Sequence, residues 1–452
     1  MNSKISVFLL ASSLCACSSA NYEKLNKSFS TNFSAGNYQS AAVDMSKQLA
    51  DKNEKGEDIL KDSPYLAGLS IGTADLFGHS YSDSMKYFDM ADKAARNNTT
   101  DSYDVKMYEK IMYNTYSTYA AMNAEPSSAK MYLNKADKAQ KENKIANKSA
   151  INDLKKDEKV KLAASKFGIN VDDFFGKVMK ATETKQVSKI NPKCMPDEGY
   201  RSEAEQKALA NFTNVYTTWL YNLFASSEGL NNIDDKNFLQ ANLCDKNQYV
   251  VSDSQVAASG KPTVWVVFEN GLVGEIAKKQ ISMQNPLVNP NFNFPINISI
   301  PEVKEISAPY SKLTVNGVNT EFLADMNSII SSELEQRRTG HIAKNIIFEL
   351  GKLTAAIGAC GGLDKPCVGF QKMVAEKIMK QETPFDTRSW TSLPKEIQMA
   401  RLDMPQNRKL NLSVDGMNLA PVVIPQNIRQ AIVVVRIPSK NATPSVLVNK
   451  LK

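Results

Sequence analysis

A change of residue pattern near residue 260 constrains the fold of this chain most. From 33 to about 245, Ala, Lys, Met and Leu are frequent and prolines are sparse, as is typical of helices. Pro262 to Phe268 is then a β-branched and aromatic run, which predicts a buried strand. The sequence therefore predicts an α+β fold, with an all-α N-terminal domain at 33–250 and a β-rich domain at 260–445.

The β-rich half is expected to contain a helical insert near 321–382. One amphipathic helix is expected to carry Phe322, and a second helix is expected to start after Gly340. Asn316-Gly317 predicts a hairpin turn. Strands are expected at 262–268, 272–283, 296–300, 396–402, 409–414 and 431–437.

The helical half contains a weak internal repeat. Ser84, Phe88 and Ala91 are spaced small, large, small, which lets a neighbouring helix approach closely. Ala129, Leu133 and Ala136 share this spacing, whereas the segment that starts at Ala41 matches only its first two positions. The spacing resembles the second helix of tetratricopeptide (TPR) repeats, with loops longer than usual. An ordinary helical bundle is the alternative. As a TPR-like array, the helices would bind a partner, with Tyr38, Tyr81 and Phe88 as candidate contacts.

The N-terminus predicts export and lipidation. Met1 to Lys4 carries one positive charge, and an apolar run of 5–11 follows it. Leu14-Cys15-Ala16-Cys17 resembles a bacterial lipobox. That resemblance implies a signal peptide at 1–16, acylation of Cys17 and a tether at 17–32. Ser18 implies an outer-membrane location facing the periplasm. An inner-membrane anchor and an ordinary secretory signal are the alternatives.

The remaining cysteines suggest disulfides in an oxidising compartment. Cys360 and Cys367 flank a Gly-rich turn and are expected to pair, which leaves Cys194 to pair with Cys244. The other pairings and buried free thiols are alternatives. A metal centre is not expected, because there is no CxxC and no His near a Cys.

No catalytic residue or cofactor is expected from local motifs. The chain lacks the Gly-rich phosphate loops and the zinc-protease motif, and it has only two histidines, His79 and His341. Glu269 and Glu275 are the best local candidates for paired catalytic carboxylates. A net charge of +7 over 452 residues does not indicate nucleic-acid binding.

A family resemblance follows from three features together: the lipobox, the helical half, and the motifs at 268–273 and 386–394. In combination they resemble an uncharacterised family of bacterial TPR-like lipoproteins. The resemblance implies an envelope protein, with no enzymatic activity to transfer. On a strand, Asp386, Arg388 and Trp390 would share one face, with the Trp390 ring over the guanidinium. This row would form either a structural lock or a surface that recognises a partner.

These observations favour a lipid-anchored scaffold or assembly factor that binds an envelope protein. One alternative is an enzyme that acts on peptidoglycan, or an activator of a cell-wall synthase. Another is a structural component of a secretion or surface assembly. The sequence leaves the oligomeric state open.

Overall fold

A five-stranded mixed sheet lies at the centre of the molecule. Its strand order is β13-β12-β1-β7-β6, and β1 (Thr263–Asn270) runs parallel to β12 (Gln430–Ile437) and antiparallel to β7 (Glu396–Asp403). β6 (Glu321–Asp325) and β13 (Ser445–Lys450) form its edges. Every residue of β1 and β12 is buried, because both faces of the sheet are covered.

The computed structural model describes nine segments of the chain. They are 26–50, 64–97, 103–140, 214–230, 249–283, 295–304, 306–362, 366–381 and 386–452. The expected signal peptide, Cys17, Cys194 and Cys244 lie outside these residues.

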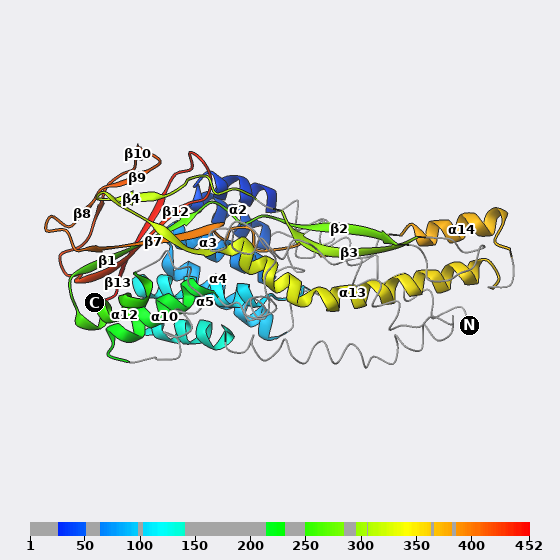
Figure 1. The fold of residues 1–452 in the computed structure, drawn as a ribbon, viewed down its shortest axis with the longest axis horizontal. Coiled ribbons are helices and arrows are strands. Elements are labelled where there is room, and N and C mark those ends of the chain that lie inside the picture. The colour runs from blue at the N-terminus through cyan, green and yellow to red at the C-terminus, as the bar shows by residue number, and fades with distance from the viewer. Residues whose placement is uncertain are drawn as a thin grey trace, which may run out of the picture.

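Alternate residues of the central strands belong to two different cores. Trp265 and Val267 of β1 pack in a core shared with the helices, whereas Val264, Val266 and Phe268 pack in the core on the opposite face. Short strands cover that opposite face (Figure 1). They are β4 (Leu313–Val315), β5 (Val318–Asn319), β8 (Lys409–Leu410), β9 (Leu412–Val414), β10 (Met417–Asn418) and β11 (Val422–Val423).

Helices cover the first face. They are 26–34, α2 (Tyr38–Ala50), α3 (Pro64–Phe77), α4 (Tyr81–Arg96), α5 (Met107–Ala124), the short 3₁₀ turn η1 (Pro126–Ser128), 129–140, α10 (Val215–Ser227) and α12 (Val250–Ser259). Residues from Phe29 to Leu447 contribute to the one core between this helical layer and the sheet. The predicted α+β class is therefore confirmed, and the helices and the sheet are joined through a continuous apolar interior.

The small, large, small positions lie in helix contacts, as expected. Ser84, Phe88 and Ala91 are buried, and the hydroxyl of Ser84 donates to the carbonyl oxygen of Gly72 at 2.7 Å. A Cβ on Gly72 would lie 2.9 Å from the Phe88 ring. The absence of a side chain at Gly72 therefore permits the close approach of α3 and α4.

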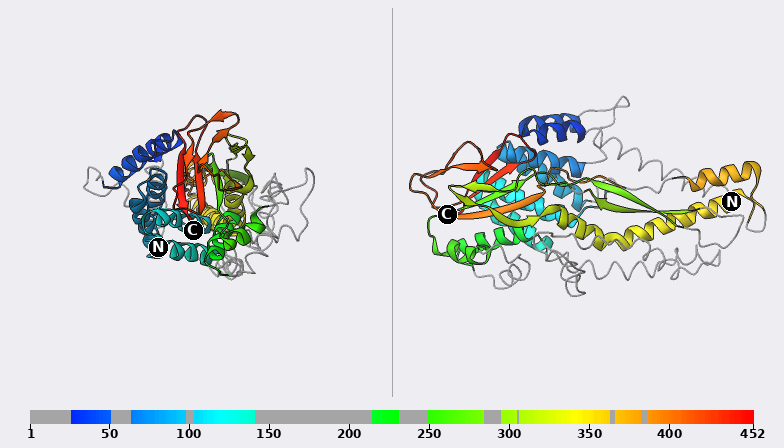
Figure 2. Two further views of the ribbon diagram at one scale, coloured as in Figure 1. Left: turned by 90° about the vertical axis from the view of Figure 1, so that its left-hand side faces the viewer. Right: turned by 45° about the horizontal axis from the view of Figure 1, so that its top comes forward.

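A long arm projects from this body. It comprises β2 (Ile276–Met283), β3 (Ile296–Val303), α13 (Met326–Ala359) and α14 (Gly369–Met379), and it extends away from the sheet (Figure 1 and Figure 2, right). The 34 residues of α13 span about 51 Å at 1.5 Å per residue. Its first turns lie in the body, where Met326 and Ile330 join the core. Further out, the Asn345 side-chain oxygen accepts the backbone N–H of Ser299 at 3.0 Å and holds β3 on the helix.

The helical insert differs from the sequence prediction in two respects. Phe322 lies in strand β6, paired with Gln398 of β7, and the helix starts only at Met326. Asp325 ends the strand and caps the helix, because its side chain accepts the backbone N–H of Ser328 at 2.9 Å. The predicted break at Gly340 is wrong, since α13 continues through it to Ala359. A single helical Gly costs only about 1 kcal/mol, which the packing of a long helix can offset.

Two other predictions for the C-terminal half are confirmed. Asn316 and Gly317 turn between β4 and β5 with φ values of 47° and 86°. Cys360 and Cys367 form a disulfide with Cα atoms 5.0 Å apart. This bridge joins the end of α13 to the start of α14 at the distal end of the arm.

Candidate functional site

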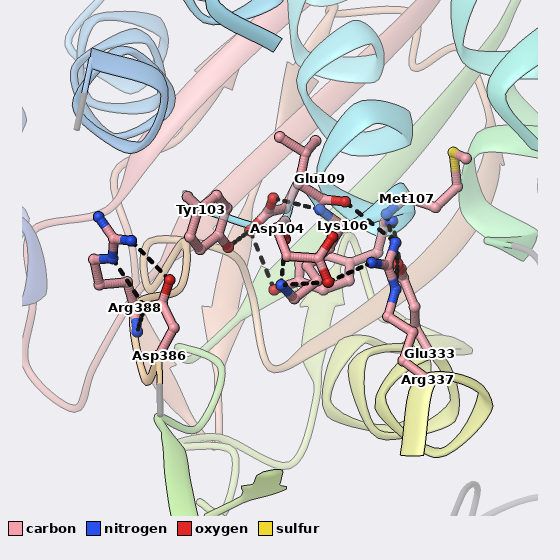
Figure 3. Close-up of polar contacts among 11 residues, drawn as sticks. Tyr103, Asp104, Lys106, Met107, Glu109, Glu333, Arg337, Asp386 and Arg388 are labelled. Atoms are coloured by element: carbon pink, nitrogen blue, oxygen red, sulfur yellow. Dashed lines mark hydrogen bonds and ion pairs between the residues drawn. The ribbon is translucent and has the colours of Figure 1, made fainter. Parts of the chain in front are cut away.

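A cluster of polar side chains lies where the helical layer meets the base of the arm (Figure 3). It draws on the segment before α5, the first turn of α5, helix α13 and the segment that returns to the sheet. We call it the junction cluster. Its members are Tyr103, Asp104, Lys106, Glu109, Glu333, Arg337, Asp386 and Arg388.

Glu333 of α13 caps the N-terminus of α5. Its carboxylate oxygens accept the backbone N–H groups of Met107 at 2.7 Å and Tyr108 at 2.8 Å. A helix N-terminus carries unpaired N–H groups and a partial positive charge, so it favours a carboxylate. The guanidinium of Arg337, one turn later, lies 2.8 Å from both Glu333 and Asp104. These contacts tie the arm helix to the body.

Glu109 is a fully buried carboxyl group within the same cluster. The Tyr103 hydroxyl donates to one of its oxygens at 2.5 Å, and the backbone N–H of Lys106 donates to the other at 3.0 Å. Burial raises the pKa of Glu109 to about 7, against the opposing effects of the Lys106 charge and these two hydrogen bonds. Glu109 is not among the residues predicted from the sequence, although a Glu three residues after a helix N-cap is a recognisable capping signal.

The Tyr103 ring lies between two cations. The Lys106 ammonium is 4.7 Å from its centroid, and the Arg388 guanidinium carbon is 5.5 Å from it. Arg388 also makes a bidentate contact with Asp386, with both nitrogen–oxygen distances at 2.8 Å. The predicted Asp–Arg hydrogen bond is therefore confirmed, and the ring beside the guanidinium is that of Tyr103.

Trp390 does not share this contact, which corrects the predicted row. Residues 386–390 form no strand, so the alternation of side chains assumed for that row does not apply. Trp390 is completely buried and packs edge-to-face against Phe88 and Tyr116, with centroid distances of 6.2 and 5.9 Å. Its place is in the core between the helices and the sheet.

A second buried charge pair lies in that core. A Glu269 oxygen is 3.6 Å from an Arg436 nitrogen, and neither side chain is exposed. The same Glu269 oxygen accepts the Tyr116 hydroxyl at 2.9 Å, and Arg436 donates to the Ser392 carbonyl at 2.9 Å. Burial raises the pKa of Glu269 to about 7, whereas Arg436 and the Tyr116 hydrogen bond act to lower it. The side chain thus links α5 to the sheet.

Glu269 and Glu275 occupy opposite environments. The side chain of Glu275 is 69% exposed and pairs with Lys304 at 3.3 Å. Glu269 points into the apolar interior instead, among the Tyr116 and Arg436 side chains. The structure therefore does not arrange them as an acid and a base on one substrate.

The other side chains that were predicted to contact a partner are mostly buried. Tyr38 and Phe88 are 5% and 1% exposed, so their predicted role on a binding surface must be corrected to a role in the core. Tyr81 is partly exposed, and its hydroxyl is 2.9 Å from Nδ1 of His79 in the turn before α4. His341, expected at a helix start, lies within α13.

Comparisons with known proteins add no relative. No protein-family model, curated protein or solved structure matches this chain. Among the described residues, no group of three or more His, Cys, Asp or Glu is placed to hold a metal ion. In the same part of the chain, no helix combines the length and the apolar character needed to cross a bilayer.

Proposed function

We propose that this chain is a lipid-anchored envelope protein of the periplasmic side that acts as a scaffold or assembly factor. The observation that carries the proposal is the junction cluster, which fixes a long arm to a body of helices and sheet through the Arg337–Asp104 ion pair and the buried cap that Glu333 forms on α5. A protein that holds an extended arm at a set angle to its body is suited to organising other molecules. The resemblance to TPR-like lipoproteins agrees with this role.

The helical layer is the proposed partner-binding part. Its antiparallel helices pack through small residues, as TPR-like hairpins do, and α4 presents a polar outer face while it buries Ser84, Phe88 and Ala91. Lys86 and Lys93 are exposed on that outer face. With Tyr38 and Phe88 inside, the outer face of α4 is the part of the layer offered to a partner.

The experiment is site-specific photocrosslinking in the native envelope. A photoreactive residue replaces Lys86 or Lys93 in one set of chains, and it replaces the exposed Met417 or Val423 of the short strands in a matched set. We expect one discrete crosslinked product from the α4 positions and none from the control positions. Equal products from both sets, or none from either, would contradict partner binding through the helices.

Lipidation is tested separately. Metabolic labelling with an alkyne-modified palmitate, followed by mass spectrometry of the N-terminal peptide, should find acyl chains on Cys17, and Cys17→Ala should abolish them. Membrane fractionation of the labelled protein should place it with the outer membrane. Recovery in the inner-membrane fraction would support the alternative location.

We propose a non-enzymatic role because the two fully buried carboxyl groups with a pKa near 7 have structural partners. Glu109 and Glu269 are fully buried and hold the junction cluster and the core together. Incubation of the purified protein with peptidoglycan sacculi should release no soluble fragments. Release of fragments would support the alternative of a wall-acting enzyme.

A further inference from the structure

The distal end of the arm exposes a cluster of large apolar side chains. Val368, Phe370 and Met373 are 64%, 74% and 57% exposed, and they lie just after the disulfide and in the first turns of α14. The opposite face of α14 is already packed, because its Ala375 and Met379 contact α13. The three side chains are therefore surplus to the packing of the arm itself.

Exposed lysines lie behind this apolar end. Lys377 follows Met373 by four residues and Phe370 by seven, and Lys380 follows Met373 by seven, so both lysines lie on the same helix face, nearer the body. Lys372 is exposed beside them, and Glu376 is the one acidic residue at 366–381. The segment 353–362, which comprises the last turns of α13 and the turn after it, contains no charged residue. Apolar groups at the end and cations behind them match the order of acyl chains and anionic headgroups in a membrane.

We propose that the tip of the arm docks onto a lipid bilayer with anionic headgroups. Phe370, Met373 and Val368 enter the headgroup–acyl boundary, and Lys377 and Lys380 contact the headgroups. Three side chains are too few for a stable protein–protein interface, which needs about 800 Å² on each partner. They are enough for shallow insertion, which the lysines reinforce. The Cys360–Cys367 bridge presents them already ordered, so that little conformational freedom is lost on docking.

The test uses the full chain reconstituted in vesicles of phosphatidylglycerol and phosphatidylcholine with brominated acyl chains, which quench nearby indoles. The three native tryptophans, Trp219, Trp265 and Trp390, are buried in the body and supply a constant background. F370W places an indole at the tip. V423W, at a position that is 66% exposed on the short strands of the body, is the matched control.

We expect the emission added by F370W to fall about twofold or more in brominated vesicles, and that added by V423W to stay unchanged. K377Q with K380Q should weaken the quenching, as should vesicles of phosphatidylcholine alone. Each lysine removed should reduce tip binding by about fivefold. Chain that floats with the vesicles while the F370W indole stays unquenched would overturn the proposal, and so would chain that does not float.

A second copy of the chain is the competing occupant of the tip. In that case sedimentation in detergent would show an oligomer that Phe370→Asp dissociates, and the F370W indole would stay unquenched by lipid. That result would assign the apolar tip to self-association and overturn bilayer docking.

Discussion

Glu333 on α13 accepts the backbone N–H of Tyr108, the second residue of α5, at 2.8 Å. The two residues are 225 positions apart in the chain, so this contact closes the joint between arm and body. Glu333→Gln keeps an acceptor but removes the charge that faces both the helix N-terminus and Arg337. We expect it to lower the free energy of unfolding by about 1–3 kcal/mol in urea denaturation.

Glu275→Gln is the matched control for that substitution. Glu275 also pairs with a cation, Lys304, but both side chains are more than half exposed. Its loss should change the free energy of unfolding by no more than about 0.5 kcal/mol. Equal effects of the two substitutions would mean that the cap at α5 adds nothing to the joint.

The Glu269–Arg436 pair gives a prediction about buried charge. Arg436→Met leaves the Glu269 carboxylate without its cation in the apolar interior, and it should cost about 3–5 kcal/mol in the free energy of unfolding. Adding Glu269→Gln removes the unpaired charge, so the double variant should be more stable than Arg436→Met alone. A double variant whose loss equals the sum of the two single losses would show that the residues do not interact.

Glu109 predicts a pH dependence with a definite sign. Its pKa is about 7 in the folded protein, and the ordinary value for an unfolded chain is 4.5. The folded protein therefore binds the proton more tightly, and this contribution to stability is complete below pH 4.5 and is lost as the pH rises through 7. Relative to the native chain, Glu109→Gln should remove about 3 kcal/mol of pH dependence over this interval, measured as unfolding free energies at successive pH values.

Local patterns predicted much of the fold. The β-branched run predicted at 262–268 is buried strand from Thr263 onward, because its composition fits a sheet covered on both faces. The Gly-rich loop between Cys360 and Cys367 turns back as expected, because Gly361 and Gly362 adopt positive φ values of 79° and 121°. In both places the structure depends on residues that are close together in the sequence.

The junction cluster could not be predicted in this way. Glu333 meets α5 only through tertiary packing. From the sequence, a single Glu in an amphipathic helix is expected to be exposed to solvent. The Asp386–Arg388 contact was visible as a short-range pair, but its aromatic neighbour, Tyr103, comes from far along the chain. Trp390, chosen because it is nearby in sequence, lies instead in the core with Phe88 and Tyr116.

The arm disulfide predicts a local change in stability. Replacing both Cys360 and Cys367 with Ser frees an eight-residue loop, and on chain-entropy grounds this should cost about 2–3 kcal/mol in the docking of α14. Amide hydrogen exchange should accelerate in α14 and the last turns of α13. The five-stranded sheet should keep its protection, since its core does not include the bridge. Uniformly faster exchange in arm and sheet would contradict a local role.

Gly72→Ala tests the close approach of α3 and α4. The new Cβ would lie 2.9 Å from the Phe88 ring, and Phe88 is held between the two helices and Trp390. We expect a loss of about 1–3 kcal/mol in the free energy of unfolding, because the buried ring would have to shift against Tyr116 and Trp390. Gly351→Ala is the matched control, since this Gly is also helical and has nothing within 4 Å of the added atom. It should stabilise α13 by about 0.5–1 kcal/mol through helix propensity alone. Urea denaturation measures both variants, and a Gly72→Ala chain as stable as the native one would show that α3 and α4 do not require this contact.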